Sequence, residues 1–344
     1  MKEIKIGIIG LGRMGITHYS IVNTNPDAKI VCVADTSDMI TRIFKKYHDD
    51  VSICQNYQQI YENEGVDAII VSTPPAMQYE IVKSALDRNV NVFVEKPFTA
   101  NLTQANELAK ISEERGIVNQ VGYANRFNDI FLLVREYIKD NVIGELVRFK
   151  SEMFSRTITK SDEKNTWRDS REGGGGAVFD MASHSIDLVN YIIGKPDKII
   201  GTCLNKIYSK NVEDAVFSTF VYKNGISGIL NVNWSDTSYR KPINKIEIFG
   251  KKGKIVADQY CCKIYLESPL EEKKLKEGWN TIYITDIFKS VPFYLRGNEF
   301  TSQLYDFIDC IKNGGRSKCS FRDGVNVLEI AQSMFNDYET NGRA

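Results

Sequence analysis

The chain is poor in histidine and cysteine, and its charges cancel. Only three of its 344 residues are histidines and seven are cysteines, while 44 basic residues balance 44 acidic ones. A net charge of zero gives no field that would attract nucleic acid or an anionic membrane, so we expect neither as a partner. No apolar run approaches the ~20 residues of a membrane-spanning helix. The first apolar stretch is interrupted by glycine, unlike a signal peptide.

The cysteines are arranged in a way that argues against the usual cysteine-based sites. None forms a C-x-x-C pair, and Cys261 and Cys262 are adjacent in the sequence. This spacing suits neither a zinc site nor an easy disulfide. We therefore expect reduced, mostly buried thiols, no metal site and a cytoplasmic protein. A length of 344 residues suits two domains.

The first 35 residues carry the clearest pattern. An apolar run at residues 5–9 leads into Gly10-Leu11-Gly12-Arg13-Met14-Gly15, and a helical pattern and a second apolar run follow, ending at Asp35. A G-x-G-x-x-G sequence between a strand and a helix, with an acid about 20 residues later, is typical of a Rossmann dinucleotide-binding domain. Gly10 would allow a tight turn, Gly12 a close approach to a diphosphate, and Gly15 tight packing of helix on strand.

The first third of the chain alternates short strands with helices. We expect further strands at residues 68–71, 90–94 and 118–122, and helices at 16–23, 38–47, 77–88 and 101–115. Such alternation predicts an α/β fold with a parallel, doubly wound sheet. Ligands of these sheets bind at the carboxyl ends of the strands. The residues that follow strand ends here are Gly10, Asp35, Thr73, Glu95 and Lys96.

Beyond Gly122 the strands lengthen and alternate. After a helix at 131–140 we expect strands at 146–154, 199–205, 215–222, 226–234, 245–249, 254–257 and 263–266, then helices around 300–311 and 327–335. This pattern predicts an α+β domain with a large, mostly antiparallel, open sheet. We expect a dinucleotide-binding domain over residues 1–122 and a substrate-binding and oligomerisation domain over 123–344. Apolar side chains on both faces of two strands predict a homodimer or homotetramer.

Two groups of residues have side chains suited to acid–base chemistry. Asp180 and His184 follow four consecutive glycines, and a helix over 177–193 would place them on one face. A carboxylate beside an imidazole suits a general base. Lys96 directly follows an apolar strand, where an ammonium group can hold a substrate oxygen. Each feature alone also has an ordinary explanation, a solvated helix or a surface lysine.

Taken together, these motifs resemble the glucose-fructose oxidoreductase / inositol dehydrogenase (Gfo/Idh/MocA) family over essentially the whole chain. The motifs concerned are the glycine-rich turn, Val71-Ser72-Thr73-Pro74-Pro75, Glu95-Lys96-Pro97, the run from Gly122 to Phe127, Asp180-x-x-x-His184-x-x-Asp187, Phe307-Ile308-Asp309 and Asp323-Gly324. The resemblance implies that Lys96, Asp180 and His184 are catalytic. It also implies that Asn125 contacts substrate and that the Thr73-Pro74 turn lies against the cofactor. Gln78 departs from the family, which often has histidine there.

The resulting prediction is an NAD(P)-dependent oxidoreductase acting on a secondary alcohol or ketone of a polyol, sugar or sugar derivative, including sugar nucleotides. His184, oriented by Asp180, would accept the proton while Lys96 holds the oxygen, although Lys96 is an alternative acceptor. Further candidate substrate contacts are Trp167, Arg168, Trp234 and Tyr239. Two alternatives stay open: a redox-assisted, glycosidase-like enzyme or one that keeps its cofactor bound, and a non-enzymatic NAD(P)-binding regulator.

NAD is the expected cofactor, with NADP possible. Asp35 would accept hydrogen bonds from the adenosine ribose and repel a 2′-phosphate, and Thr36-Ser37-Asp38 supplies no arginine to bind that phosphate. The expected cofactor-binding residues are Gly10, Gly12, Arg13, Met14, Gly15, Asp35, Thr73, Pro74, Glu95 and Lys96.

Overall fold

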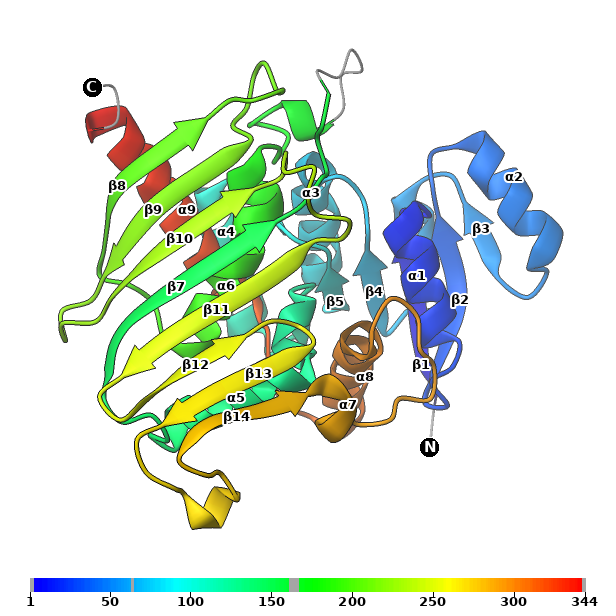
Figure 1. Cartoon of the computed structure of the whole chain (residues 1–344). Helices are drawn as coiled ribbons and strands as arrows, with labels where there is room; N and C mark the ends of the chain where they lie inside the picture. Colours follow the sequence, from blue (N-terminus) through cyan, green and yellow to red (C-terminus); the bar gives the residue numbers. More distant parts are fainter. Residues whose placement is uncertain (1–2, 63–64, 161–166, 342–344) are drawn as a thin grey trace. The chain divides into compact units, whose positions relative to one another are not determined.

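The computed structural model describes residues 3–62, 65–160 and 167–341, and these residues form two compact units (Figure 1). The first unit comprises Met1–Ala124 and Ser290–Val325, and the second comprises Asn125–Lys289 and Asn326–Ala344. The sequence predicts a single domain boundary, after residue 122. In the structure, residues 290–325 also group with the first unit.

The first unit is built on a six-stranded sheet of order β3-β2-β1-β4-β5-β6, and all its pairs are parallel. Its strands are β1 (Ile4–Ile9), β2 (Ala28–Ala34), β3 (Ser52–Cys54), β4 (Ala68–Val71), β5 (Asn91–Val94) and β6 (Asn119–Val121). Strand order reverses beside β1, which is the arrangement of a doubly wound nucleotide-binding sheet. The predicted α/β fold is confirmed, while the three-residue β3 was not expected.

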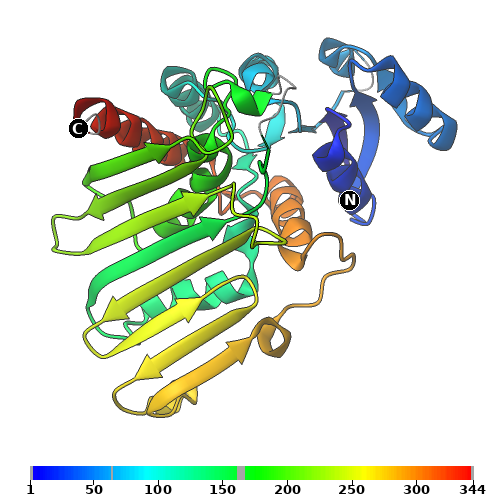
Figure 2. The same cartoon turned by 45° about the horizontal axis from the view of Figure 1, so that its top comes forward.

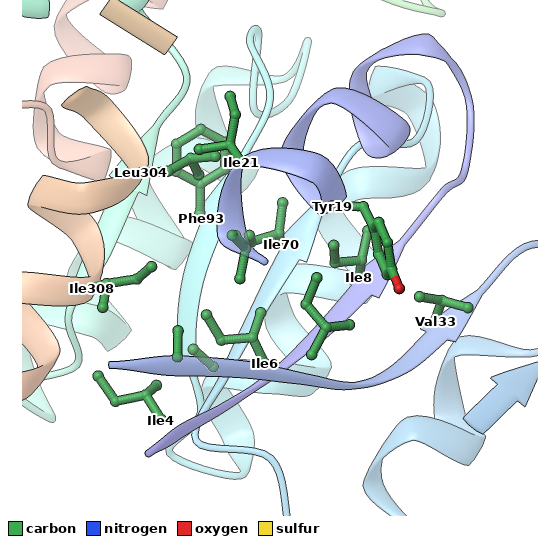
Figure 3. Packing of buried hydrophobic residues seen from close by; sticks show 14 of the residues in the cluster. Ile4, Ile6, Ile8, Tyr19, Ile21, Val33, Ile70, Phe93, Leu304 and Ile308 are labelled. Carbon is green, nitrogen blue, oxygen red and sulfur yellow. The ribbon is translucent and has the colours of Figure 1, made fainter. Parts of the chain in front are cut away.

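Helices flank this sheet. They are α1 (Arg13–Val22), α2 (Asp38–Tyr47), α3 (Pro75–Asp87), α4 (Leu102–Glu114) and α8 (Asn298–Asn313). The helix α8 comes from late in the chain but packs against α1 and β1. Figure 3 shows the apolar cluster that holds it, in which Leu304 and Ile308 of α8 lie with Ile6, Ile21 and Phe93. Burial of each such side chain stabilises the unit by about 1.5–3 kcal/mol. This gain explains why α8 packs on the first unit although it lies late in the chain.

The second unit contains an eight-stranded sheet of order β14-β13-β12-β11-β7-β10-β9-β8. Its strands are β7 (Leu146–Phe154), β8 (Lys198–Asn205), β9 (Ala215–Val221), β10 (Ser227–Asn233), β11 (Ile243–Gly250), β12 (Gly253–Ala257), β13 (Cys261–Leu266) and β14 (Gly278–Tyr283). Every pair is antiparallel except β7 with β10. The prediction of a mostly antiparallel sheet is confirmed, although β14 was not expected.

Helices cover one face of the second sheet, and the other face is open within this unit (Figures 1 and 2). The helices are α5 (Asp129–Lys139), α6 (Ser183–Ile192) and α9 (Phe321–Asn341), and a short α7 (Ile284–Ile287) follows β14. The open face mixes apolar and charged side chains. Phe217, Phe249, Tyr265 and Trp279 are exposed there, and Lys254 forms an ion pair with Glu247. Apolar side chains therefore lie on both faces of β9 and β10, and charged side chains accompany them on the open face of the sheet.

All seven cysteines lie among the described residues, none of them forms a disulfide, and five are buried. Burial raises the pKa of Cys32 and of Cys262 to about 12, so both thiols stay protonated. In the described part of the chain, no helix is long and apolar enough to cross a membrane.

Candidate active site

The glycine-rich turn has the geometry that its three glycines predict. Gly10 has a φ of +89°, and an added Cβ would lie 2.9 Å from the Ser72 carbonyl carbon and oxygen. A Cβ on Gly15 would lie 1.8 Å from the Gly10 carbonyl oxygen, so only glycine lets α1 pack on β1. A Cβ on Gly12 would meet no described atom within 4 Å. Open space therefore lies in front of Gly12, where a diphosphate needs it.

The N-terminus of α1 faces the same turn. The helix begins at Arg13, and its N-cap residue Gly12 has no side chain that could accept hydrogen bonds from the first backbone N–H groups. Such free N–H groups, together with the positive end of the helix dipole, bind anions. The turn and the helix start thus fit the diphosphate of a dinucleotide.

Asp35 follows β2 and holds the turn from the other side. One carboxylate oxygen (Oδ2) accepts a hydrogen bond from the Leu11 backbone N–H at 2.7 Å, and the other (Oδ1) accepts from Ser37 N–H at 2.8 Å. The carboxylate is therefore fixed between the glycine-rich turn and the start of α2. A fixed anion at this place suits ribose hydroxyls and disfavours a 2′-phosphate.

Buried polar groups gather where β4 ends. The Gln78 amide, on α3, donates to the Thr73 carbonyl oxygen at 2.8 Å. Three neighbouring buried atoms, Ser72 Oγ, Thr73 Oγ1 and Gln78 Oε1, have no hydrogen-bond partner among the described residues. Unpaired buried polar atoms are rare and often mark a place that a ligand or water completes. The end of β4, including the Thr73-Pro74 turn, therefore also fits a bound nucleotide.

Glu95 and Lys96 follow β5, and Glu95 is tied to α1. Its Oε1 lies 2.7 Å from Nε2 of His18, a fully buried side chain that also contacts Phe93. Arg296 interacts electrostatically with both Arg13 and Glu95. Burial lowers the pKa of Arg296 most, repulsion from Arg13 lowers it further, and attraction to Glu95 acts against this. Sequence reasoning missed His18 and Arg296 because neither belongs to a motif. Lys96 is half-buried and precedes a cis peptide bond to Pro97.

In the second unit, Asp180 lies in a single π-helical turn, Val178–Ala182, which continues into α6 with His184 as its second residue. The helix expected over 177–193 is therefore present, but over its first turn the hydrogen bonds span one residue more than in an α-helix. Asp180 is buried, and its Oδ2 accepts from Arg168 Nε at 2.9 Å. Asp180 is thus ion-paired with Arg168, a residue that the sequence predicts only as a substrate contact.

The next acid on the same helix has a structural role. Asp187 is fully buried and accepts from Arg126 Nε at 3.0 Å on each oxygen and from Nη2 at 2.7 Å on Oδ1. This bidentate pair joins α6 to the short 3₁₀ turn Ala124–Phe127 that carries Asn125. Asn125 is half-buried beside it.

The four other candidate substrate contacts differ in exposure. Trp167 and Arg168 are both half-buried, and the guanidinium lies 4.4 Å from the centre of the indole ring. Tyr239 stacks on Phe154 at 5.3 Å between ring centres and is half-buried. Trp234 is fully buried, and its Nε1 donates to Asp214 at 2.6 Å. Because Trp234 is buried, its assignment as a substrate contact is wrong. The alternation of side chains in a strand predicts that two faces differ, but it does not tell which face packs on the core.

Within the described ranges, no cluster of three or more histidine, cysteine, aspartate or glutamate side chains is arranged to hold a metal ion.

Comparisons with known proteins cover both units. Residues 4–123 match the model of an oxidoreductase family with an NAD-binding Rossmann fold, and residues 131–256 match the GFO/IDH/MocA C-terminal domain. The chain is 24% identical to scyllo-inositol 2-dehydrogenase (NAD(+)) of Bacillus subtilis, over 98% of this chain and 94% of that protein. It is 26% identical to myo-inositol 2-dehydrogenase of Thermotoga maritima, over 98% and 96%.

Two further proteins show how varied these relatives are. The chain is 26% identical to 2,7-anhydro-N-acetylneuraminate hydratase of Mediterraneibacter gnavus, over 76% of this chain and 69% of that protein. Its fold matches levoglucosan dehydrogenase in complex with NADH and levoglucosan, with a TM-score of 0.86, 19% identity and 98% of each chain covered.

Replacing Gly12 and Gly15 by alanine separates binding from folding. We expect Gly15→Ala to lower the free energy of unfolding by about 1–3 kcal/mol, because its methyl group displaces α1 from β1. Gly12→Ala should unfold at nearly the parent temperature yet bind NAD at least about tenfold more weakly, a cost of about 1.4 kcal/mol, because its methyl group fills the diphosphate space. Thermal unfolding and NAD titration measure both. Parent-like NAD binding by Gly12→Ala would contradict the assignment.

Removing the charge of Asp35 should weaken discrimination against NADP. We expect the parent protein to bind NAD more tightly than NADP, and Asp35→Ala to narrow the ratio of the two dissociation constants. Because Asp35 also holds Leu11, both affinities should fall, so the ratio is the informative quantity. Glu114→Ala, which removes an exposed negative charge at the end of α4, serves as the control. Equal or tighter binding of NADP by the parent protein would refute this prediction.

Proposed function

The chain belongs to the GFO/IDH/MocA family of NAD-binding oxidoreductases, and from this premise we propose that it oxidises a secondary alcohol of a polyol or sugar, or reduces the matching ketone. Two relatives that align over almost the whole chain are named inositol dehydrogenases. The observation that supports the proposal most is that one chain combines a dinucleotide-fitting strand edge with Lys96, Asp180 and His184.

NAD, when bound, supplies the hydride acceptor at its nicotinamide ring. The residues proposed to hold it are the glycine-rich turn with Arg13 and Met14, Asp35 for the adenosine ribose, and the Thr73-Pro74 turn. Glu95 and Lys96 at the end of β5 complete the set. These residues follow strands β2, β1, β4 and β5, which are consecutive neighbours in the parallel sheet, so they lie along one edge of it.

Oxidation of an alcohol also requires a proton acceptor and a group that stabilises the alcohol oxygen. We assign the acceptor role to the His184 imidazole, which takes the hydroxyl proton as the carbon loses its hydride. The Lys96 ammonium donates a hydrogen bond to the same oxygen and stabilises the negative charge that develops on it. Asp180, fixed by Arg168, orients the imidazole. The candidate substrate contacts are Asn125, Trp167, Arg168 and Tyr239.

A second candidate function uses the same residues without net oxidation. The relative named as a hydratase shows that proteins similar to this chain include one whose named reaction is not dehydrogenation. Removing a hydride only temporarily would activate a neighbouring bond for elimination, and the cofactor would be regenerated in each cycle. Accumulation of NADH distinguishes the two, because only the dehydrogenase releases it in amounts equal to the ketone formed.

The proposed chemistry predicts large losses of turnover with little loss of cofactor binding. Parent protein given NAD and a panel of cyclic polyols and sugars should form NADH, read at its absorbance, faster as the pH rises. We expect His184→Ala and Lys96→Ala each to lower kcat by roughly 10²–10⁴-fold, because both act on the transition state. Asp180→Asn should be milder and should shift the pH at which activity rises.

Lys110→Ala is the control for Lys96→Ala, because Lys110 is an exposed lysine on α4 that lies 3.7 Å from Glu114 of the same helix, and its loss should leave parent-level turnover. If His184→Ala keeps most of its turnover and only raises KM, Lys96 is the acceptor and the assignment is wrong. If no member of the panel yields NADH, the dehydrogenase proposal itself fails.

We also propose that the open face of the second sheet mediates a homodimer or homotetramer. Phe249 is about two-fifths exposed on this face, and Phe217 and Trp279 are exposed there as well. Exposed aromatic side chains on one sheet face are typical of interfaces. We expect Phe249→Glu to shift the mass measured by light scattering toward the monomer, whereas Tyr47→Glu on α2 should not. A parent protein that is monomeric at micromolar concentration would refute the proposal.

A further inference from the structure

The π-turn that carries Asp180 is held by a buried glutamate that is distant in the sequence. Glu213 lies just before β9, 35 residues from Val178, and its Oε1 accepts the Val178 N–H at 2.9 Å. Its backbone carbonyl accepts the Ala177 N–H, also at 2.9 Å. The first N–H groups of a helix have no partner within the helix. One residue therefore satisfies two of these donors at the start of the turn.

Glycine at position 176 makes this contact possible. Gly176 has a φ of +91°, and a Cβ there would lie 2.4 Å from Glu213 Oε1. The next residue back is equally constrained, because a Cβ on Gly175 would lie 2.2 Å from the Arg168 carbonyl oxygen. The glycine run thus lets the turn lie between two supports, Glu213 on one side and the Arg168 segment on the other.

Arg168 closes the second support. Its backbone carbonyl accepts the Gly176 N–H at 3.1 Å, and its side chain donates to Asp180. Hence the residues from Gly176 to Asp180 are fixed at both ends by groups outside the helix.

Glu213 is itself anchored by its neighbour. Asp214 accepts backbone N–H groups of residues 207–209, the Ser209 hydroxyl and the Trp234 indole. Burial raises the pKa of Asp214, but the hydrogen bonds from Ser209 and Trp234 outweigh this effect and hold the pKa below its ordinary value. Burial raises the pKa of Glu213, and the Val178 N–H acts against that rise.

We propose that Glu213 is a positioning residue for catalysis: it fixes the π-turn so that Asp180 and His184 meet the substrate at reacting distance. The inference rests on the proposed function of Asp180 and His184. Glu213 is bonded to the backbone of the turn and has no assigned contact with cofactor or substrate. A displacement of about 1 Å can cost on the order of 10²-fold in rate, so a support of this kind controls turnover.

Two substitutions separate the reach of the side chain from its charge. Glu213→Gln removes the charge but keeps a side-chain oxygen that can accept the Val178 N–H. Glu213→Asp keeps the charge, but its side chain is one methylene shorter and does not reach the Val178 N–H. We expect Glu213→Asp to lower kcat by roughly 10- to 100-fold and Glu213→Gln to stay within about threefold of the parent. The dissociation constant for NAD should not change in either variant.

The matched control is Asp337→Ala. Asp337, on α9, accepts the Thr202 N–H at 2.7 Å and so holds another part of the same unit. Its loss should lower the unfolding temperature without lowering kcat. Losses of kcat in Asp337→Ala as large as those in Glu213→Asp would reduce the role of Glu213 to general stability and overturn the proposal.

Hydrogen–deuterium exchange of residues 177–184 provides a readout independent of activity. Exchange there should be faster in Glu213→Asp and parent-like in Glu213→Gln. Unchanged exchange in Glu213→Asp, or a Glu213→Gln variant as slow in turnover as Glu213→Asp, would overturn the proposal. Faster exchange with parent-level turnover would also overturn it. If instead His184→Ala is fully active, the failure lies in the proposed function and not in the contact of Glu213.

Discussion

The buried pair of Arg126 and Asp187 is the interaction on which the second unit's chemistry depends. Both side chains are almost wholly inaccessible, and the guanidinium also lies 4.9 Å from the centre of the Tyr191 ring. Removing one partner of a buried ion pair costs about 3–5 kcal/mol, because the other charge is left unpaired. The pair therefore joins α6, the helix that carries His184, to the 3₁₀ turn that carries Asn125.

A similar rule governs the strand edge of the first unit. Three contacts connect different strands and helices at this edge: Asp35 accepts from the glycine-rich turn, Gln78 donates to Thr73, and Glu95 lies against His18 on α1. Such cross-connections mean that the nucleotide meets groups already in place, which lowers the entropy lost on binding.

Sequence reasoning succeeded where the signal is local. Three glycines in register with Asp35 predict both the turn and its use, and alternation predicts β7 to the residue. It failed where tertiary contacts decide. The π-turn at Asp180 is bonded to Glu213 and Arg168, and the sequence of the turn does not indicate these partners. The burial of Trp234 depends on Asp214, and the return of α8 on an apolar surface made by β1 and α1.

The central claim is that the chain removes a hydride from a carbon bearing a hydroxyl group and that NADH carries it away. The direct measurement uses a polyol deuterated at the reacting carbon, with mass spectrometry of the dinucleotide and the product. The account predicts one deuterium in the reduced dinucleotide for each ketone formed. Product that keeps or regains the deuterium while the released dinucleotide contains none would contradict it.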